Sequence, residues 1–104
     1  KNFAFLLNDA TGEWTLSPAY DLTWTLGPGG EHTMTVAGER RAPGQPHLLK
    51  LATQAGLSRR DTDRILAEVR KAVSRWPEYA SQAAVPEEDT RRITASLGLT
   101  PIDP

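Results

Sequence analysis

The hydrophobic periodicity of the sequence changes near residue 45, and this change constrains the fold more than any other feature. Before that point, apolar residues run continuously or alternate in short segments separated by turn-forming residues, as in β-strands. Beyond it, they recur every three or four positions, as in amphipathic helices. We therefore predict an α+β fold, in which a strand-rich segment at 1–45 precedes a helical subdomain at 46–104.

The strand-rich segment predicts a β-hairpin and one further strand. Residues 3–7 form a continuous apolar run, typical of a strand buried on both faces, and residues 13–16 alternate between polar and apolar side chains. Between them lies Asn-Asp-Ala-Thr-Gly, in which Gly12 can adopt a positive φ angle. A third short strand is expected at 33–36.

One helix is marked more clearly than the others. Its apolar stripe consists of Ile65, Leu66, Val69, Ala72, Val73 and Trp76. Ser58, followed by Asp61 three residues later, resembles a capping box at its start. Pro77 limits the helix, which we expect to reach Trp76.

Three other helices have weaker signals. One runs from Pro46, a residue suited to a first helical turn, to Gly56, which can end a helix in a left-handed conformation. A short alanine-rich helix is expected at 78–85, and a last one between Pro86 and Gly98, with acidic residues in its first turn. The fold class is therefore a β-hairpin plus a short strand followed by a bundle of about four helices.

Composition narrows the classes of protein to which the chain can belong. Its 104 residues suffice for one small domain. The formal net charge of −1 gives no general attraction to nucleic acid or to an anionic membrane. The absence of cysteine excludes disulfides and fits a reducing, cytoplasmic setting. The longest apolar run, at 3–7, is much shorter than the roughly 20 residues that span a bilayer, so we expect no membrane association.

Asn2 and Asp21 are the residues most suited to chemistry. Asn2 precedes the hairpin and Asp21 follows it, and because a hairpin returns the chain to its starting edge, the two could lie close together. An amide oxygen and a carboxylate beside a nucleotide are the groups with which phosphoryl-transfer sites hold magnesium. The alternative is that Asn2 and Asp21 only cap turns or a helix, and spacing alone favours this alternative.

A family resemblance favours the magnesium interpretation. The motifs are Lys-Asn-Phe-Ala-Phe-Leu-Leu at 1–7, Trp-Thr-Leu-Ser-Pro-Ala-Tyr-Asp-Leu at 14–22 and Gly-Gly-Glu-His-Thr-Met-Thr-Val-Ala-Gly at 29–38. They resemble the segment of HipA-like serine/threonine kinases that runs from the end of the catalytic loop through the metal-binding aspartate. The resemblance implies that the whole chain, 1–104, is the C-terminal part of such a kinase domain, a fragment of a kinase-like C-lobe.

The resemblance also implies roles for three residues. Lys1 and Asn2 would be the last two residues of the family's Asp-x-His-x-Lys-Asn catalytic loop, with Lys1 beside the transferring phosphate and Asn2 a ligand of Mg²⁺ and its bound ATP. Asp21 would be the second ligand, in the place of the Asp-Phe-Gly aspartate of ordinary protein kinases. The catalytic base of this pattern would precede Lys1, so we expect the chain to begin after the base and to be inactive alone.

The resemblance further implies a biological setting. It would be a bacterial toxin–antitoxin pair, in which the intact cytoplasmic kinase binds a HipB-like antitoxin and phosphorylates a protein substrate. Strand edges once paired elsewhere would also allow the chain to self-associate.

Two rival interpretations concern the helical half. Residues 48–65 resemble a helix-turn-helix, in which Ala52 and Gly56 have the spacing of a close helix contact and a turn. Against DNA binding, Thr62 occupies a position that is usually apolar, and Asp61 and Asp63 would face phosphates. The helices would equally suit an interaction module, and we expect no direct contact with nucleic acid.

The glycine-rich segment, the two histidines and one arginine pair could each suggest a binding site, but each has a plainer structural interpretation. The segment Gly27-Pro28-Gly29-Gly30 lacks the Gly-Lys-Ser/Thr ending of a phosphate loop and predicts a plain turn. His32 and His47 lie in different elements, so a transition-metal site is not expected, and His32 is interpreted as a surface histidine, although it could line a substrate cleft. The pair Arg40-Arg41 is interpreted as a solvated face.

Overall fold

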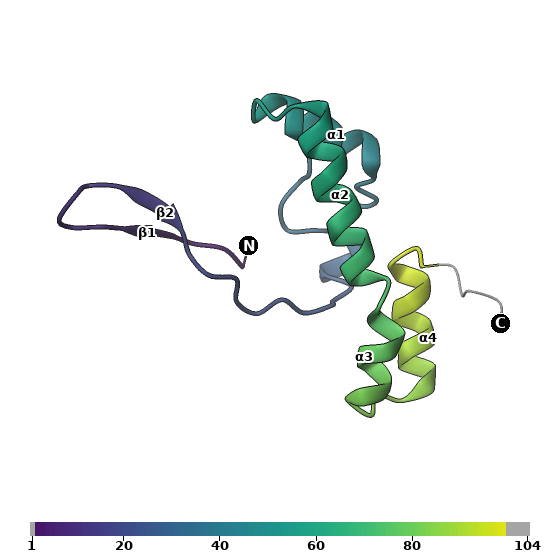
Figure 1. The fold of residues 1–104 in the computed structure, drawn as a ribbon. Coiled ribbons are helices and arrows are strands. Elements are labelled where there is room, and N and C mark those ends of the chain that lie inside the picture. The colour runs from purple at the N-terminus through teal and green to yellow at the C-terminus, as the bar shows by residue number, and fades with distance from the viewer. Residues whose placement is uncertain (1, 100–104) are drawn as a thin grey trace. The chain divides into compact units, whose positions relative to one another are not determined.

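The computed structural model describes residues 2–99 of the chain (Figure 1). The elements are β1 (Phe5–Leu7), β2 (Trp14–Leu16), the 3-10 turn η1 (Pro28–Gly30), and the helices α1 (Gln45–Gln54), α2 (Arg59–Val73), α3 (Trp76–Gln82) and α4 (Glu87–Ser96). Two compact units divide the chain, one ending at His47 and the other beginning at Leu48. The predicted α+β class, a hairpin followed by helices, is confirmed.

The first unit contains the predicted hairpin. Strands β1 and β2 are antiparallel, with Phe5 opposite Leu16 and Leu7 opposite Trp14. The turn between them closes through hydrogen bonds from the Gly12 amide to the Asn8 carbonyl, at 2.7 Å, and from the Asn8 amide to the Glu13 carbonyl, at 2.9 Å. Gly12 has a φ of 71°, the positive value for which glycine is suited. Local turn chemistry therefore fixes the register of the hairpin.

The prediction of a third strand at 33–36 is wrong. Among the described residues, this segment forms only an isolated bridge between Val36 and Glu39, with backbone hydrogen bonds of 2.8 and 3.0 Å. Ala37 and Gly38 between them both have positive φ, 49° and 92°, as in the tightest two-residue hairpin turns. The turn supplies Glu39 as a partner for Val36, but the pairing is limited to this one bridge, so the segment is not a strand.

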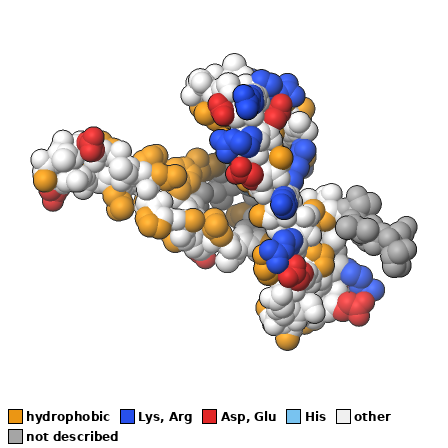
Figure 2. All heavy atoms as spheres, in the orientation of Figure 1, with side chains coloured by type: hydrophobic (Ala, Val, Ile, Leu, Met, Phe, Trp, Pro, Cys, Tyr) orange, Lys and Arg blue, Asp and Glu red, His pale blue; other side chains and the backbone are white. Residues whose placement is uncertain are grey.

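Both faces of the hairpin are exposed, contrary to the expectation of a strand buried on both faces. Phe5, Trp14 and Leu16 are 59%, 66% and 64% exposed, and Figure 2 shows hydrophobic side chains along much of the visible face of the hairpin. Two strands make a single layer, and a single layer cannot bury its own faces. Within the described residues, the hairpin therefore presents an uncovered apolar surface.

The second unit begins within α1, whose end has the hydrogen bonds of a Schellman motif. The Leu57 amide donates to the Ala52 carbonyl and the Gly56 amide to the Thr53 carbonyl, with Gly56 at a φ of 74°. Helix α2 begins two residues later, at the N-cap Ser58. Both predicted signals, the glycine stop and the serine start, are confirmed.

The long helix predicted to reach Trp76 is shorter than expected. Helix α2 ends at Val73, and α3 begins at Trp76 with Pro77 in its first turn, instead of at residue 78. Proline lacks an N–H and disfavours a helical conformation at the preceding residue, but it is tolerated in a first turn. Pro77 thus belongs to the start of a new helix.

Helices α3 and α4 pack together as an antiparallel pair (Figure 1). Ala80 on α3 is fully buried and Ile93 on α4 is buried, and the Trp76 indole donates to the Thr90 carbonyl at 3.3 Å. Ala80 and Ile93 thus form part of the core of this unit. Helix α4 begins after Pro86 and its last turn is followed by Gly98, as predicted.

Candidate functional site

Asn2 and Asp21 lie in direct contact at the base of the hairpin. The Asn2 side-chain nitrogen, Nδ2, donates to the Asp21 backbone carbonyl at 2.9 Å and to the Asp21 carboxylate oxygen Oδ2 at 3.2 Å. Asn2 precedes β1 and Asp21 follows β2, so the antiparallel pairing brings the two ends together. The proximity that the hairpin allowed is present, while a role in metal binding stays a prediction.

This contact fixes the orientation of the Asn2 amide. Nδ2 carries two protons, one for each acceptor on Asp21. The reverse orientation would place the amide oxygen against a carbonyl and a carboxylate, which repel it. The amide oxygen, Oδ1, therefore takes no part in the contact with Asp21 and is the atom of Asn2 that can bind a cation.

Asp21 has an unusual backbone conformation. Its φ is 50°, in the left-handed region that few residues other than glycine adopt, although aspartate and asparagine are several-fold enriched there. Its carboxylate is exposed, so one side chain both accepts from Asn2 and remains open to solvent and ligands.

The donor set suits a hard cation held mainly by other groups. Among residues 2–99, no cluster of three or more His, Cys, Asp or Glu side chains could hold a metal alone. Asn2 and Asp21 offer oxygen atoms only, which Mg²⁺ prefers, and Mg²⁺ sites in nucleotide-binding proteins commonly use one or two protein groups together with phosphates and water. The pair therefore fits magnesium delivered with a nucleotide. The predicted phosphate contact, Lys1, lies outside the described residues.

A pocket of about 320 Å³ lies beside Asn2 in the same unit. It is lined by Asn2, by Thr25, Leu26, Gly27 and Pro28, and by Glu31, His32 and Thr33. Asp21 is not among its lining residues. Asn2 is thus shared between the contact with Asp21 and the wall of the pocket.

A tight turn forms one side of the pocket. The Gly30 amide donates to the Gly27 carbonyl at 3.3 Å, and the Glu31 amide donates to the Pro28 carbonyl at 3.2 Å. Gly27 has a φ of 70°, and a Cβ atom there would overlap the Glu31 carbonyl oxygen. The turn thus requires glycine at Gly27, both for its positive φ and for the close backbone approach.

An ion-pair cluster supports the same loop. Arg41 contacts the Glu31 carboxylate at 2.8 Å and Arg40 at 3.5 Å, while the His32 amide donates to the Arg40 carbonyl at 2.8 Å. The interpretation of Arg40-Arg41 as a solvated face missed this contact. The missing information was the reversal at residues 37 and 38, which brings the arginines back beside Glu31.

Glu39 anchors the far side of this reversal. Its carboxylate accepts from the Arg41 amide at 2.7 Å and from the Ala42 amide at 3.1 Å. The hydrogen bonds from Ala42 and Arg41 hold the pKa of Glu39 below its ordinary value. Glu39 is therefore a charged cap that stabilises the end of the loop.

The two histidines have separate surroundings. His47 accepts a hydrogen bond from the Gly44 amide through Nδ1, at 3.0 Å, at the start of α1. His32 lines the pocket beside Asn2, as the cleft-lining interpretation allowed.

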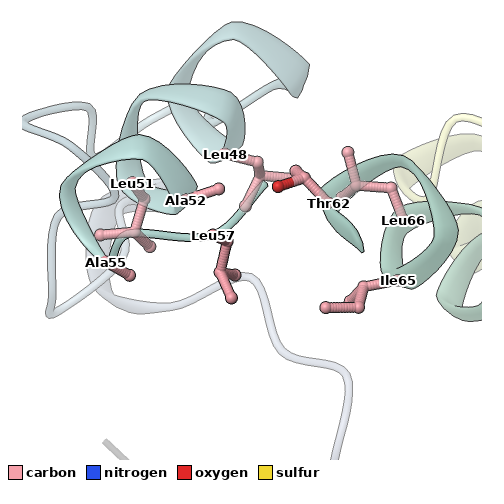
Figure 3. Close-up of a pocket in the computed structure, with 8 residues that line it drawn as sticks. All are labelled: Leu48, Leu51, Ala52, Ala55, Leu57, Thr62, Ile65 and Leu66. Carbon is pink, nitrogen blue, oxygen red and sulfur yellow. The ribbon is translucent and has the colours of Figure 1, made fainter. Parts of the chain in front are cut away.

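A second, apolar pocket of about 280 Å³ lies between α1 and α2 (Figure 3). Leu48 and Leu51 line it from α1, and Ile65 and Leu66 from α2. Among its described lining residues, the one side-chain hydroxyl belongs to Thr62, which is buried and donates to the Ser58 carbonyl at 2.8 Å. Because this hydroxyl is satisfied within its own helix, threonine is tolerated at a position that is usually apolar.

The comparisons with known proteins identify the family. The family model described as the HipA-like C-terminal domain matches residues 1–76. The chain belongs to this family. A search of curated proteins and a search of solved structures each found no match.

The family match includes every part of the candidate site. Asn2, Asp21 and the loop 25–33 all lie within it, whereas most of α3 and all of α4 lie beyond residue 76. None of the helices in residues 2–99 of this HipA-like chain combines the length and hydropathy needed to cross a membrane.

Proposed function

We propose that this HipA-like chain supplies two magnesium ligands, Asn2 and Asp21, to a serine/threonine protein kinase. The observation that carries the proposal is the contact between the two side chains, with Nδ2 of Asn2 bound to Asp21 and Oδ1 left for a cation. Membership of the HipA-like family supports it, because the family motif ends in the same Lys-Asn pair.

The proposed chemistry is transfer of the γ-phosphoryl group of ATP to a serine or threonine hydroxyl. Bound Mg²⁺ would neutralise charge on the phosphates as the transfer proceeds. Asn2 would contribute Oδ1 and Asp21 its carboxylate, and the hydrogen bond between them would hold both groups on one side of the metal. Lys1 would lie beside the transferring phosphate.

The chain by itself is proposed to be inactive. By the family resemblance, the aspartate that begins the Asp-x-His-x-Lys-Asn pattern, ahead of the Lys-Asn pair, would accept the proton of the substrate hydroxyl. Catalysis would therefore belong to the whole kinase domain.

The setting proposed for the intact protein is a cytoplasmic toxin–antitoxin pair. A HipB-like antitoxin and a protein substrate would be its partners. This proposal rests on the family resemblance.

Replacing Asp21 in a protein that carries the complete kinase domain tests the function. Asp21→Asn is the appropriate change, because asparagine also tolerates a positive φ and the variant isolates the loss of charge. We expect ATP turnover to fall below detection. Asp9→Asn, in the exposed turn of the hairpin, is the matched control and should retain full activity. Full activity of Asp21→Asn would show that Asp21 is not a metal ligand.

We propose no DNA-binding function for the helix pair α1–α2. Arg59 and Arg64 at the start of α2 pair with carboxylates on the same helix, at 2.9 Å to Asp63 and 3.2 Å to Glu68. A phosphate would have to compete with these carboxylates for the arginines. A salt-sensitive complex with duplex DNA would contradict this interpretation.

A further inference from the structure

The pocket beside Asn2 is a feature distinct from the contact between Asn2 and Asp21. Asn2 belongs to both features, whereas Asp21 contacts Asn2 without lining the pocket. A molecule in the pocket would therefore lie next to a metal held by Asn2 and Asp21, not between the two ligands. In phosphoryl transfer, the group beside the metal-bound phosphate is the acceptor.

The polar groups of the pocket suit a hydroxyl. Thr25 Oγ1 accepts from the Gly27 amide at 3.2 Å, which leaves its own proton free to donate to a ligand. Thr33 offers a second hydroxyl and His32 an imidazole, and each of these groups can donate or accept. Leu26 adds apolar contact area.

The charge of the pocket disfavours a phosphate. The one charged side chain among its described lining residues is the Glu31 carboxylate, and no lysine or arginine is among those residues. The nearby cations Arg40 and Arg41 are already paired with Glu31. Among the described lining residues, an anionic ligand would meet a carboxylate and no cationic side chain.

The volume and stiffness of the pocket also fit a short peptide segment. About 320 Å³ is at the lower end of the roughly 300–1,000 Å³ typical of small-molecule sites, which leaves room for a few side chains. The Gly27 turn holds one side, and the pairing of Glu31 with Arg41 holds the other. Because these contacts already hold the wall of the pocket, its loop and side chains would lose little conformational entropy when a ligand binds.

We propose that this pocket holds the hydroxyl-bearing acceptor segment of the phosphorylated protein, with preference for an uncharged segment over an acidic one. The inference rests on the proposed kinase function, because only then does a hydroxyl beside Asn2 have a role. It assigns Thr25, His32 and Thr33 as acceptor contacts. It also predicts that a phosphorylated product, being anionic, leaves the pocket readily.

Peptide titrations of the ¹⁵N-labelled 104-residue chain test the inference. The probes are three short capped peptides that differ only in a central serine, alanine or phosphoserine. The serine peptide should shift the amide signals of residues 25–33 in a saturable way. The alanine peptide should bind several-fold more weakly, because it lacks the hydroxyl. The phosphoserine peptide should bind about tenfold more weakly, because of Glu31.

A matched pair of variants locates the contact. Thr33→Val removes a hydroxyl that lines the pocket, and Thr35→Val removes a nearby one that does not. Only Thr33→Val should weaken binding of the serine peptide, and unchanged signals from the hairpin strands β1 and β2, in the same unit, would show that the variant is folded. Equal effects of the two variants, equal or tighter binding of phosphoserine, or no serine-dependent shifts at 25–33 would each overturn the inference.

A second measurement separates this inference from the proposed function. Mn²⁺ with ATP should broaden the signals of Asn2 and Asp21 in both threonine variants, because neither change touches the metal ligands. Loss of peptide binding with this broadening retained would overturn the acceptor pocket alone. Absence of the broadening in the unmodified chain would instead count against the magnesium site.

Discussion

The side-chain amide of Asn2 donates to both the backbone carbonyl and the carboxylate of Asp21, across a separation of 19 residues. These two bonds tie the start of the hairpin to the segment that follows it. They also determine which atom of Asn2 can bind a cation, because Nδ2 donates its protons to Asp21 while the side-chain oxygen Oδ1 takes no part in these bonds. A structural contact thus prepares the oxygen atoms of the candidate magnesium site.

Asn2→Ala should weaken metal binding by the chain itself. The change removes one proposed oxygen ligand together with both bonds to Asp21, so Mn²⁺ with ATP should broaden the Asp21 amide signal only at about tenfold higher metal concentration or more. The measurement is paramagnetic line broadening in ¹⁵N-correlated spectra. Gln82→Ala, which removes an amide side chain from α3, is the control and should leave the titration unchanged. Identical curves for the two variants would refute a role of Asn2 in metal binding.

Gly27→Ala should disturb the pocket more than the same change at Gly12. Both glycines have a φ near 70°, so both variants carry the cost of a left-handed alanine, about 1 kcal/mol. Only at Gly27 would the new Cβ also overlap the Glu31 carbonyl oxygen, whereas nothing lies within 4 Å of it at Gly12. Amide shifts of residues 25–33 should therefore change in Gly27→Ala. If the Gly12 variant changes them as much, the close approach is not what requires glycine.

The loop end capped by Glu39 should loosen in acid. Hydrogen bonds from the Ala42 and Arg41 amides lower the pKa of Glu39 from its ordinary 4.5. A depressed folded-state pKa means that the stabilisation is complete above pH 4.5 and is lost as the pH falls through the lower, folded-state value. The amide proton shifts of Arg41 and Ala42 should report this transition. Glu39→Gln keeps an acceptor oxygen but cannot titrate, so its shifts should stay flat; a wild-type midpoint above 4.5 would contradict the assignment.

Ala80→Leu should separate α3 from α4. Ala80 is fully buried on α3, and overpacking of this kind typically costs about 1–3 kcal/mol. The readout is the indole N–H signal of Trp76, which donates to Thr90 in the closed pair. Ala95→Leu, at an exposed position on α4, makes the same change of side chain without steric conflict and should preserve the signal.

Ser58→Ala should destabilise the start of α2. The Ser58 hydroxyl accepts from the Asp61 amide at 3.1 Å and donates to the Asp61 carboxylate at 2.6 Å, and loss of an N-cap of this kind costs about 1 kcal/mol. Thermal unfolding followed by circular dichroism should show lower helicity and an earlier transition. Ser81→Ala, at an exposed position within α3, removes no cap and should not lower helicity. Equal behaviour of the two variants would mean that Ser58 is not an effective cap.

The elements that could be predicted depend on neighbouring residues. Gly12 in the hairpin turn, Gly56 after α1 and Ser58 before α2 act within about one turn of backbone, so their chemistry is visible in the sequence. The prediction of a third strand was wrong because a strand needs continuous pairing with a partner, and the segment pairs only at the bridge between Val36 and Glu39. The boundary between α2 and α3 was misplaced because Pro77 can either end one helix or begin another.

The sequence by itself determined the hairpin, the helices, the family motif and the two residues suited to magnesium. The tertiary structure alone decided that Asn2 presents its oxygen and not its nitrogen, that Glu31 pairs with Arg40 and Arg41, and that a pocket lies beside Asn2. Periodicity and capping are local and are encoded over a few residues. The direction of an amide and the charge of a pocket depend on residues that only chain reversal brings together, so they emerge only once the chain has folded.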